Sequence, residues 1–181
     1  MTEPLPSLAI VGGTGALGTG LAYRWARAGY PVAIGSRSRE KGVAAATELR
    51  TRLPDATVSG AENRDVAGTA AIIILTVPYA HHRSTLEDIK AEVQGKIVVD
   101  TTVPLVPPKV TRVQLSDDWP VAKSAQSLLG ANVRVVSAFH NVAAAHLQRE
   151  KGPDDGDVLV CGNDSAARQA VIELVAATGL R

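Results

Sequence analysis

The stretch Ile10-Val-Gly-Gly-Thr-Gly-Ala-Leu-Gly18 is the strongest indication of the fold in this sequence. It places the pattern Gly-x-Gly-x-x-Gly directly after a short apolar run and at the start of a helical pattern, which is typical of a dinucleotide-binding turn. Gly13 permits a tight turn, Gly15 leaves space for a pyrophosphate, and Gly18 lets the helix approach the sheet. The free N–H groups at the helix start would meet the phosphate charge. The alternative is a glycine-rich turn that serves only packing.

The rest of the chain alternates short apolar runs with longer helical patterns, which predicts a parallel sheet with crossover helices. The expected strands cover residues 8–11, 32–34, 57–58, 71–76, 96–100, 133–138 and 157–160. The expected helices cover residues 16–28, 40–53, a segment after Pro78, 121–129, 143–147 and a last segment capped by Asp164 or Ser165. We therefore expect one α/β domain over residues 1–181, with a Rossmann-type doubly wound, mostly parallel sheet of about seven or eight strands and helices on both faces.

Composition and charge exclude several classes of protein. The net charge of +1 gives no field that would attract nucleic acid or an anionic membrane. The longest apolar run, Ala70 to Leu75, is too short to span a bilayer, and the N-terminus lacks the features of a signal peptide. The single cysteine, Cys161, fits a reducing compartment, so we expect a cytoplasmic protein. Because Cys161 lies in an apolar run, we expect it to be buried.

The end of the second expected strand indicates which dinucleotide binds. An NAD site usually has Asp or Glu at this point, but here the sequence reads Gly35-Ser-Arg-Ser-Arg-Glu-Lys41. Ser36 would supply a hydroxyl, and Arg37 and Lys41 would supply positive charge, to the 2′-phosphate of NADP(H). The alternative is a solvated basic helix start. Cations there oppose the helix dipole unless an anion is bound, so we favour the phosphate.

Several segments, in order along nearly the whole chain, carry a more specific pattern. They are Gly12-Gly-Thr-Gly-Ala-Leu-Gly18, Gly35-Ser-Arg37 with Lys41, Thr76-Val-Pro-Tyr79, Ser137-Ala-Phe-His-Asn-Val142 and Val160-Cys-Gly162. Together they resemble the NADPH-dependent reductases of the deazaflavin coenzyme F420. The resemblance implies hydride transfer between NADP(H) and F420 or a related flavin. Members of that family form homodimers and continue beyond the position of Arg181 with a helical tail, which is absent from this sequence.

The resemblance further implies a role for individual residues. Thr14, Ala16 and Leu17 would line the pyrophosphate, and Ser36, Arg37 and Lys41 would hold the 2′-phosphate. Thr76, Val77 and Pro78 would pass beneath the stretch from adenosine to nicotinamide. The nicotinamide and the incoming deazaflavin would be flanked by Ala138, His140, Asn141, Val142 and Ala144.

Such a reaction needs little acid–base chemistry from the protein. The two rings must stack with about 3–3.5 Å between the reacting atoms, and the proton can come from solvent. His140 is the candidate for a hydrogen bond to the nicotinamide amide or the deazaflavin, or only to backbone groups. His81 and His82 are adjacent in a helix and face different ways, and the scattered histidines lack ligand spacing, so we expect no metal.

Other parts of the sequence leave choices open. Asp100, Thr101 and Thr102 end the fifth expected strand on the ligand side of the sheet, where they would edge a substrate cleft or only cap the strand. The acceptor could also be a ferric complex, reduced through a flavin, or a pterin. An alternative from another class is an NADP(H)-binding module or sensor without turnover.

Overall fold

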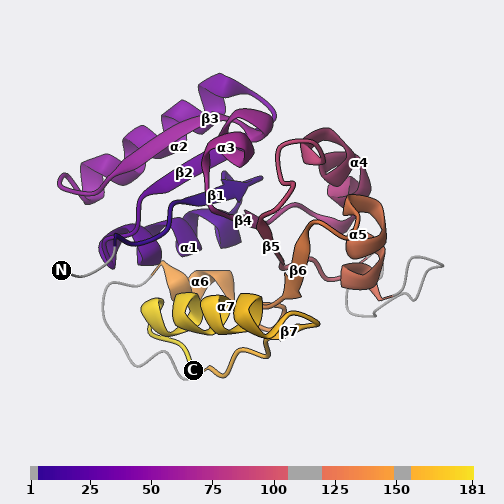
Figure 1. Cartoon of the computed structure of the whole chain (residues 1–181). Helices are drawn as coiled ribbons and strands as arrows, with labels where there is room; N and C mark the ends of the chain where they lie inside the picture. Colours follow the sequence, from indigo (N-terminus) through magenta and orange to yellow (C-terminus); the bar gives the residue numbers. More distant parts are fainter. Residues whose placement is uncertain (1–3, 106–119, 149–155) are drawn as a thin grey trace.

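The computed structural model describes residues 4–105, 120–148 and 156–181, which form one sheet flanked by helices (Figure 1). The strand order is β3-β2-β1-β4-β5-β6-β7, and every neighbouring pair is parallel except β6 and β7. The strands are β1 (Leu8–Val11), β2 (Val32–Ser36), β3 (Val58–Glu62), β4 (Ile72–Leu75), β5 (Ile97–Asp100), β6 (Arg134–Ser137) and β7 (Cys161–Gly162). The predicted Rossmann-type, mostly parallel sheet is confirmed.

The helices cover both faces of this sheet. They are α1 (Ala16–Arg27), α2 (Arg39–Arg52), α3 (Asn63–Thr69), α4 (Tyr79–Ile89), α5 (Val121–Leu129), α6 (Ala144–Leu147) and α7 (Ser165–Ala177). Along β1, Leu8 and Ile10 point into the core that contains α1, α2, α6 and α7, whereas Ala9 and Val11 point into the core beneath α3, α4 and α5. Burial on both faces explains why the central strands read as continuous apolar runs.

The expected strand at residues 157–160 is wrong. The structure has no strand there, and β7 pairs antiparallel with β6 at Cys161 and Gly162 instead. Cys161 is also exposed, which corrects the expectation that it is buried. The reason is that an edge segment is covered on fewer sides than a central strand. Val158 and Val160 pack, partly buried, against the core, whereas Leu159 between them is 75% exposed.

Other boundaries follow the sequence closely. Asp164, not Ser165, caps α7, and its Oδ1 accepts the Ala167 N–H at 2.7 Å. The short helix α3 is not predicted by the sequence, because its few residues carry no extended apolar period. No helix in the described ranges is long and apolar enough to span a bilayer.

The end of β6 is fixed by an aromatic contact in the core. Phe139 has a left-handed backbone (φ 63°), and its buried ring packs edge-on against Trp25, with 5.8 Å between the ring centroids. Trp25 in turn donates its indole N–H to the Leu174 carbonyl oxygen of α7. A left-handed non-glycine residue is held by surrounding packing, so this contact fixes the direction in which the chain leaves β6.

Candidate functional site

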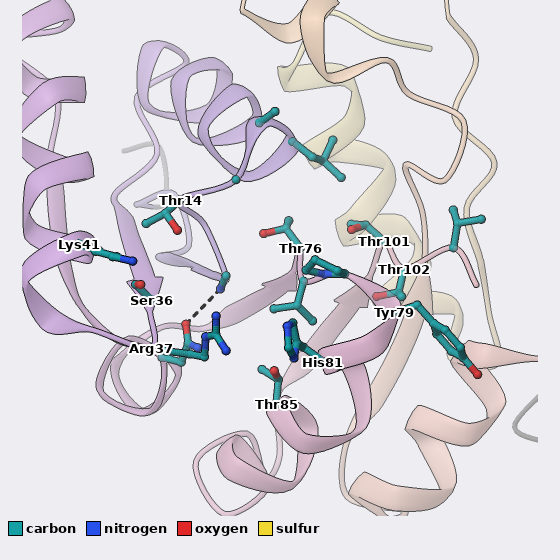
Figure 2. A pocket seen from close by; sticks show the side chains of 18 of the residues that line it. Thr14, Ser36, Arg37, Lys41, Thr76, Tyr79, His81, Thr85, Thr101 and Thr102 are labelled. Carbon is teal, nitrogen blue, oxygen red and sulfur yellow. Dashed lines mark hydrogen bonds between the residues drawn. The ribbon is translucent and has the colours of Figure 1, made fainter. Parts of the chain in front are cut away.

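A cleft of about 940 Å³ opens at the carboxyl ends of the central strands. It lies where β1 and β4 are neighbours and the strand order changes direction, which is the place where open α/β sheets bind ligands. Figure 2 shows its labelled side chains converging from several elements. The lining residues are Gly12, Thr14, Gly15, Ala16, Leu17, Ser36, Arg37, Ser38, Lys41, Asn63, Thr76, Val77, Pro78, Tyr79, His81, Thr85, Thr101, Thr102, Val103 and Leu105.

The turn after β1 is shaped by Gly12 rather than by Gly13. Gly12 has a left-handed backbone (φ 73°), and a Cβ placed on it would lie 2.4 Å from Val77 Cγ1. Its N–H donates to Asn63 Oδ1 at 3.1 Å, so the start of α3 holds the turn. This corrects the expectation that Gly13 provides the conformational freedom of the turn. Gly13 is needed for space, because a Cβ there would lie 2.7 Å from the Ile10 carbonyl oxygen.

The start of α1 presents main-chain N–H groups to the cleft. Gly15 is its N-cap and has no side chain to cap the helix, and the first turn contains no acidic residue. A Cβ on Gly15 would meet only the Gly12 carbonyl oxygen, at 3.9 Å, so the space above it belongs to the cleft. Gly18 has the expected packing role, since its Cβ would lie 2.6 Å from Gly13 Cα. An uncapped helix N-terminus beside open space suits an anion.

One end of the cleft carries positive charge. Arg37 and Lys41 are exposed, line the cleft and have no ion-pair partner among the described residues. Arg39, between them in sequence, is instead paired with Asp65. The Glu40 carboxylate accepts a hydrogen bond from the Ser38 hydroxyl, and this bond lowers the pKa of Glu40. Glu40 is therefore bound to Ser38 and forms no ion pair with Arg37 or Lys41. Two unpaired cations beside a hydroxyl-bearing strand end form a local anion site.

The middle of the cleft is formed by the segment after β4. Thr76 donates its hydroxyl to the Val11 carbonyl oxygen at 3.0 Å, which joins β4 to the end of β1. Val77 and Pro78 follow in the cleft wall, and Pro78 is the N-cap of α4. These residues lie between the cationic end and the far end of the cleft, as the resemblance implies for a segment beneath a dinucleotide.

The far end of the cleft is lined by hydroxyl groups and apolar groups from β5 and α4. Thr101 and Thr102 reach the cleft, which supports the reading that they edge a substrate cleft, and the sequence did not identify Tyr79 or Thr85 as lining residues. His81 lines the cleft, whereas His82 turns away into the protein. The two histidines therefore face different ways, as expected. Within the described ranges, no group of His, Cys, Asp or Glu gathers as a metal site.

Beneath this end lies a buried polar pair. His82 Nε2 and Asp100 Oδ2 are 2.8 Å apart, and Asp100 Oδ1 accepts the Thr102 N–H at 3.0 Å. His82 is 5% exposed and Asp100 is fully buried. The pair joins α4 to the end of β5 and fixes the backbone at Thr102.

Replacing Asp100 by Leu is expected to lower the free energy of unfolding by about 2–4 kcal/mol, because the buried His82 ring and the Thr102 N–H both lose their acceptor. Asn at position 100 can still accept from Thr102 and hydrogen-bond His82, so Asp100→Asn is expected to lose less than half as much. Urea denaturation of the three proteins measures the difference. Equal stabilities for the Leu variant and the wild type would contradict this role of the pair.

The predicted residues after β6 lie apart from the cleft walls. Ala138 is buried, and Ala144 begins α6, which packs on α1. Asn141 donates its Nδ2 to the Asp157 carbonyl oxygen, and Val142 is partly buried. The His140 residue as a whole is exposed to solvent. Partial desolvation of its ring lowers the pKa of His140, against the opposing effect of the Asp100 charge, and so favours the neutral imidazole.

The fold and the cleft are those of a Rossmann-type, dinucleotide-binding protein. A sequence model of the family "NADP oxidoreductase coenzyme F420-dependent" matches residues 7–104. The chain belongs to this family. It is 42% identical over 174 residues to the F420-dependent NADP reductase of Methanocaldococcus jannaschii, covering 92% of this chain and 77% of that protein.

The chain is also similar to a second curated reductase and to a solved structure. The F420-dependent NADP reductase of Methanothermobacter marburgensis is 38% identical over 173 residues, which cover 92% of this chain and 77% of that protein. Among solved structures, a hypothetical protein from Sinorhizobium meliloti superimposes with a TM-score of 0.79 at 27% identity, covering 97% of this chain and 82% of that one.

Proposed function

We propose that this chain transfers hydride between NADPH and the deazaflavin coenzyme F420. The observation that carries the proposal is the cleft itself, in which unpaired cations at the end of β2 and an uncapped helix N-terminus lie in line with a neutral end at β5. That order of charge matches the 2′-phosphate, the pyrophosphate and the neutral nicotinamide nucleoside of NADP(H). Membership of the F420-dependent family supports F420 as the second substrate.

In the reaction NADPH is oxidised to NADP⁺, while F420 takes up the hydride and one proton from solvent and becomes F420H₂. The protein's part is binding and orientation. The N–H groups of Ala16 and Leu17 would hold the pyrophosphate, and Ser36, Arg37 and Lys41 would hold the 2′-phosphate. Thr14 and the segment Thr76-Val77-Pro78 would complete the walls on either side of the dinucleotide.

We propose that the substrate side lies toward the end of β6. His140, whose pKa is lowered by partial desolvation, would hydrogen-bond the nicotinamide amide or the deazaflavin rather than transfer a proton. Ala138 would stay beneath the rings as a small buried residue, and Asn141, Val142 and Ala144 would approach the deazaflavin. Asn141, Val142 and Ala144 lie outside the walls of the dinucleotide cleft, which suits a second substrate that enters beside the first.

The test is NADPH oxidation by the purified chain with F420, FMN, FMN with a ferric chelate, a pterin, and no acceptor. We expect oxidation with F420 to exceed oxidation with each other acceptor. Faster turnover with the ferric chelate or the pterin would identify one of the alternative reductases. Tight NADPH binding with no oxidation by any acceptor would favour a binding module or sensor.

We also propose that residues 1–181 act as one NADP-binding domain and that the chain forms a homodimer. The exposed edge at β7 and the exposed Leu159 support a further contact on that side. The single cysteine of the chain supports a cytoplasmic location.

A further inference from the structure

Thr102 carries a buried hydroxyl without a partner. The residue is 4% exposed and lines the cleft, and its Oγ1 has no hydrogen bond among the described residues. Its neighbour Thr101 differs, because Thr101 Oγ1 donates to the Leu75 carbonyl oxygen at 2.8 Å. A buried hydroxyl usually has a partner, since an unsatisfied polar group destabilises the fold. A group left unpaired in the wall of a binding cleft indicates a partner that arrives with the ligand.

The backbone that carries this hydroxyl is fixed. Asp100 accepts the Thr102 N–H, and the same carboxylate is held by His82 from α4. Figure 2 shows the Thr102 side chain in the wall of the cleft, near Tyr79 and opposite the cationic end formed by Arg37 and Lys41. The hydroxyl is therefore placed on a rigid strand end before a ligand binds, which reduces the entropy lost on binding.

The position of Thr102 in the cleft indicates which half of NADP(H) its hydroxyl would contact. A dinucleotide with its 2′-phosphate at Arg37 and its pyrophosphate at the start of α1 extends toward β5. Thr101 and Tyr79 line the cleft together with Thr102, and they carry hydroxyls and no charge. A neutral donor or acceptor fits this end better than a phosphate does.

We propose that Thr102 Oγ1 hydrogen-bonds the nicotinamide nucleoside half of NADP(H), through a ribose hydroxyl or the carboxamide. This inference rests on the proposed binding of NADP(H). The deazaflavin also carries neutral polar groups, so the test separates the two ligands. Asp100 is a positioning residue in this arrangement, because it holds the Thr102 backbone and does not itself line the cleft.

The test uses Thr102→Val, which keeps the shape of the side chain and removes the hydroxyl. We expect the Kd for NADPH, measured without F420, to rise about fivefold to tenfold. The Kd for adenosine 2′,5′-bisphosphate, which lacks the nicotinamide half, is expected to stay the same. The Tm of the free protein is expected to rise, because the variant no longer buries an unpaired hydroxyl. Thr102→Ser restores the hydroxyl and is expected to restore most of the affinity, and the exposed Thr51→Val is the matched control.

Other results for the two nucleotide affinities and the KM for F420 would overturn the inference, and each has a different meaning. If Thr102→Val binds NADPH as tightly as the wild type, the hydroxyl does not serve the dinucleotide, although the proposed function stands. If NADPH affinity is unchanged and only the KM for F420 rises, the hydroxyl serves the acceptor. Equal weakening of NADPH and adenosine 2′,5′-bisphosphate would place the effect on the adenosine half. If the wild type binds neither nucleotide, the proposed function and this inference both fail.

Discussion

Replacing Arg37 by Asp is expected to weaken NADPH binding about 100-fold and to leave NADH binding within about threefold of the wild type. The wild type is expected to prefer NADPH over NADH by at least about tenfold, since Arg37 and Lys41 are free to bind a phosphate. The variant loses a charge-assisted hydrogen bond to the 2′-phosphate and gains a repulsive charge at the same place. NADH has a 2′-hydroxyl in place of the 2′-phosphate, and this hydroxyl can donate a hydrogen bond to a carboxylate.

Titration of both dinucleotides by calorimetry or fluorescence measures the change in preference. Arg39→Asp is the matched control, because it makes the same change of charge two positions along the chain, at a residue that pairs with Asp65 and is absent from the cleft walls. We expect the control to keep the preference for NADPH. A variant at Arg37 that also keeps it would show that the 2′-phosphate binds elsewhere.

Much of the fold could be predicted because the central strands are buried on both faces. Ile72–Leu75 and Ile97–Asp100 read as apolar runs between helical patterns, and both form strands in the parallel sheet. The glycine pattern and the strand–helix alternation depend only on local sequence, so they locate the start of α1 and the ends of β1 and β2. The cleft residues that lie on these elements could therefore be predicted from the sequence.

The rest of the site depends on contacts between distant parts of the chain. Asn63 reaches the glycine turn from α3, and His82 reaches Asp100 from α4, and neither pairing has a local signal in the sequence. The expectation that Gly13 gives the turn its freedom failed for a similar reason. Gly12 lies against Val77, which follows the neighbouring strand β4 and is distant in sequence, so this close approach has no local signal. At the sheet edge, the apolar residues before Cys161 were wrongly predicted to form a strand. Hydropathy alone does not show which residues pair with a neighbouring strand, and here only Cys161 and Gly162 pair with β6.

Replacing Gly15 by Val is expected to abolish binding of NADPH and NADH together, with a loss of at least about 100-fold for each, while the protein stays folded. The backbone of Gly15 is in an ordinary region (φ −81°), and a Cβ there meets only the Gly12 carbonyl oxygen at 3.9 Å. The fold can therefore accept the side chain, apart from a loss of up to about 1 kcal/mol for a poor N-cap residue. The added methyl groups would occupy the space that the pyrophosphate needs.

The same substitution at Gly18 separates the two roles of glycine in this turn. A Cβ on Gly18 would lie 2.6 Å from Gly13 Cα and 2.9 Å from Thr76 Oγ1, so Gly18→Val is expected to unfold the domain or lower its Tm sharply. Thermal denaturation and dinucleotide titration of both variants give the comparison. Because the pyrophosphate is common to both dinucleotides, the variant at Gly15 should lose NADH as well, unlike the variant at Arg37, which should lose only NADPH. A folded Gly15→Val protein that still binds NADPH tightly would mean that the start of α1 does not hold the phosphates, whatever the charges at β2 do.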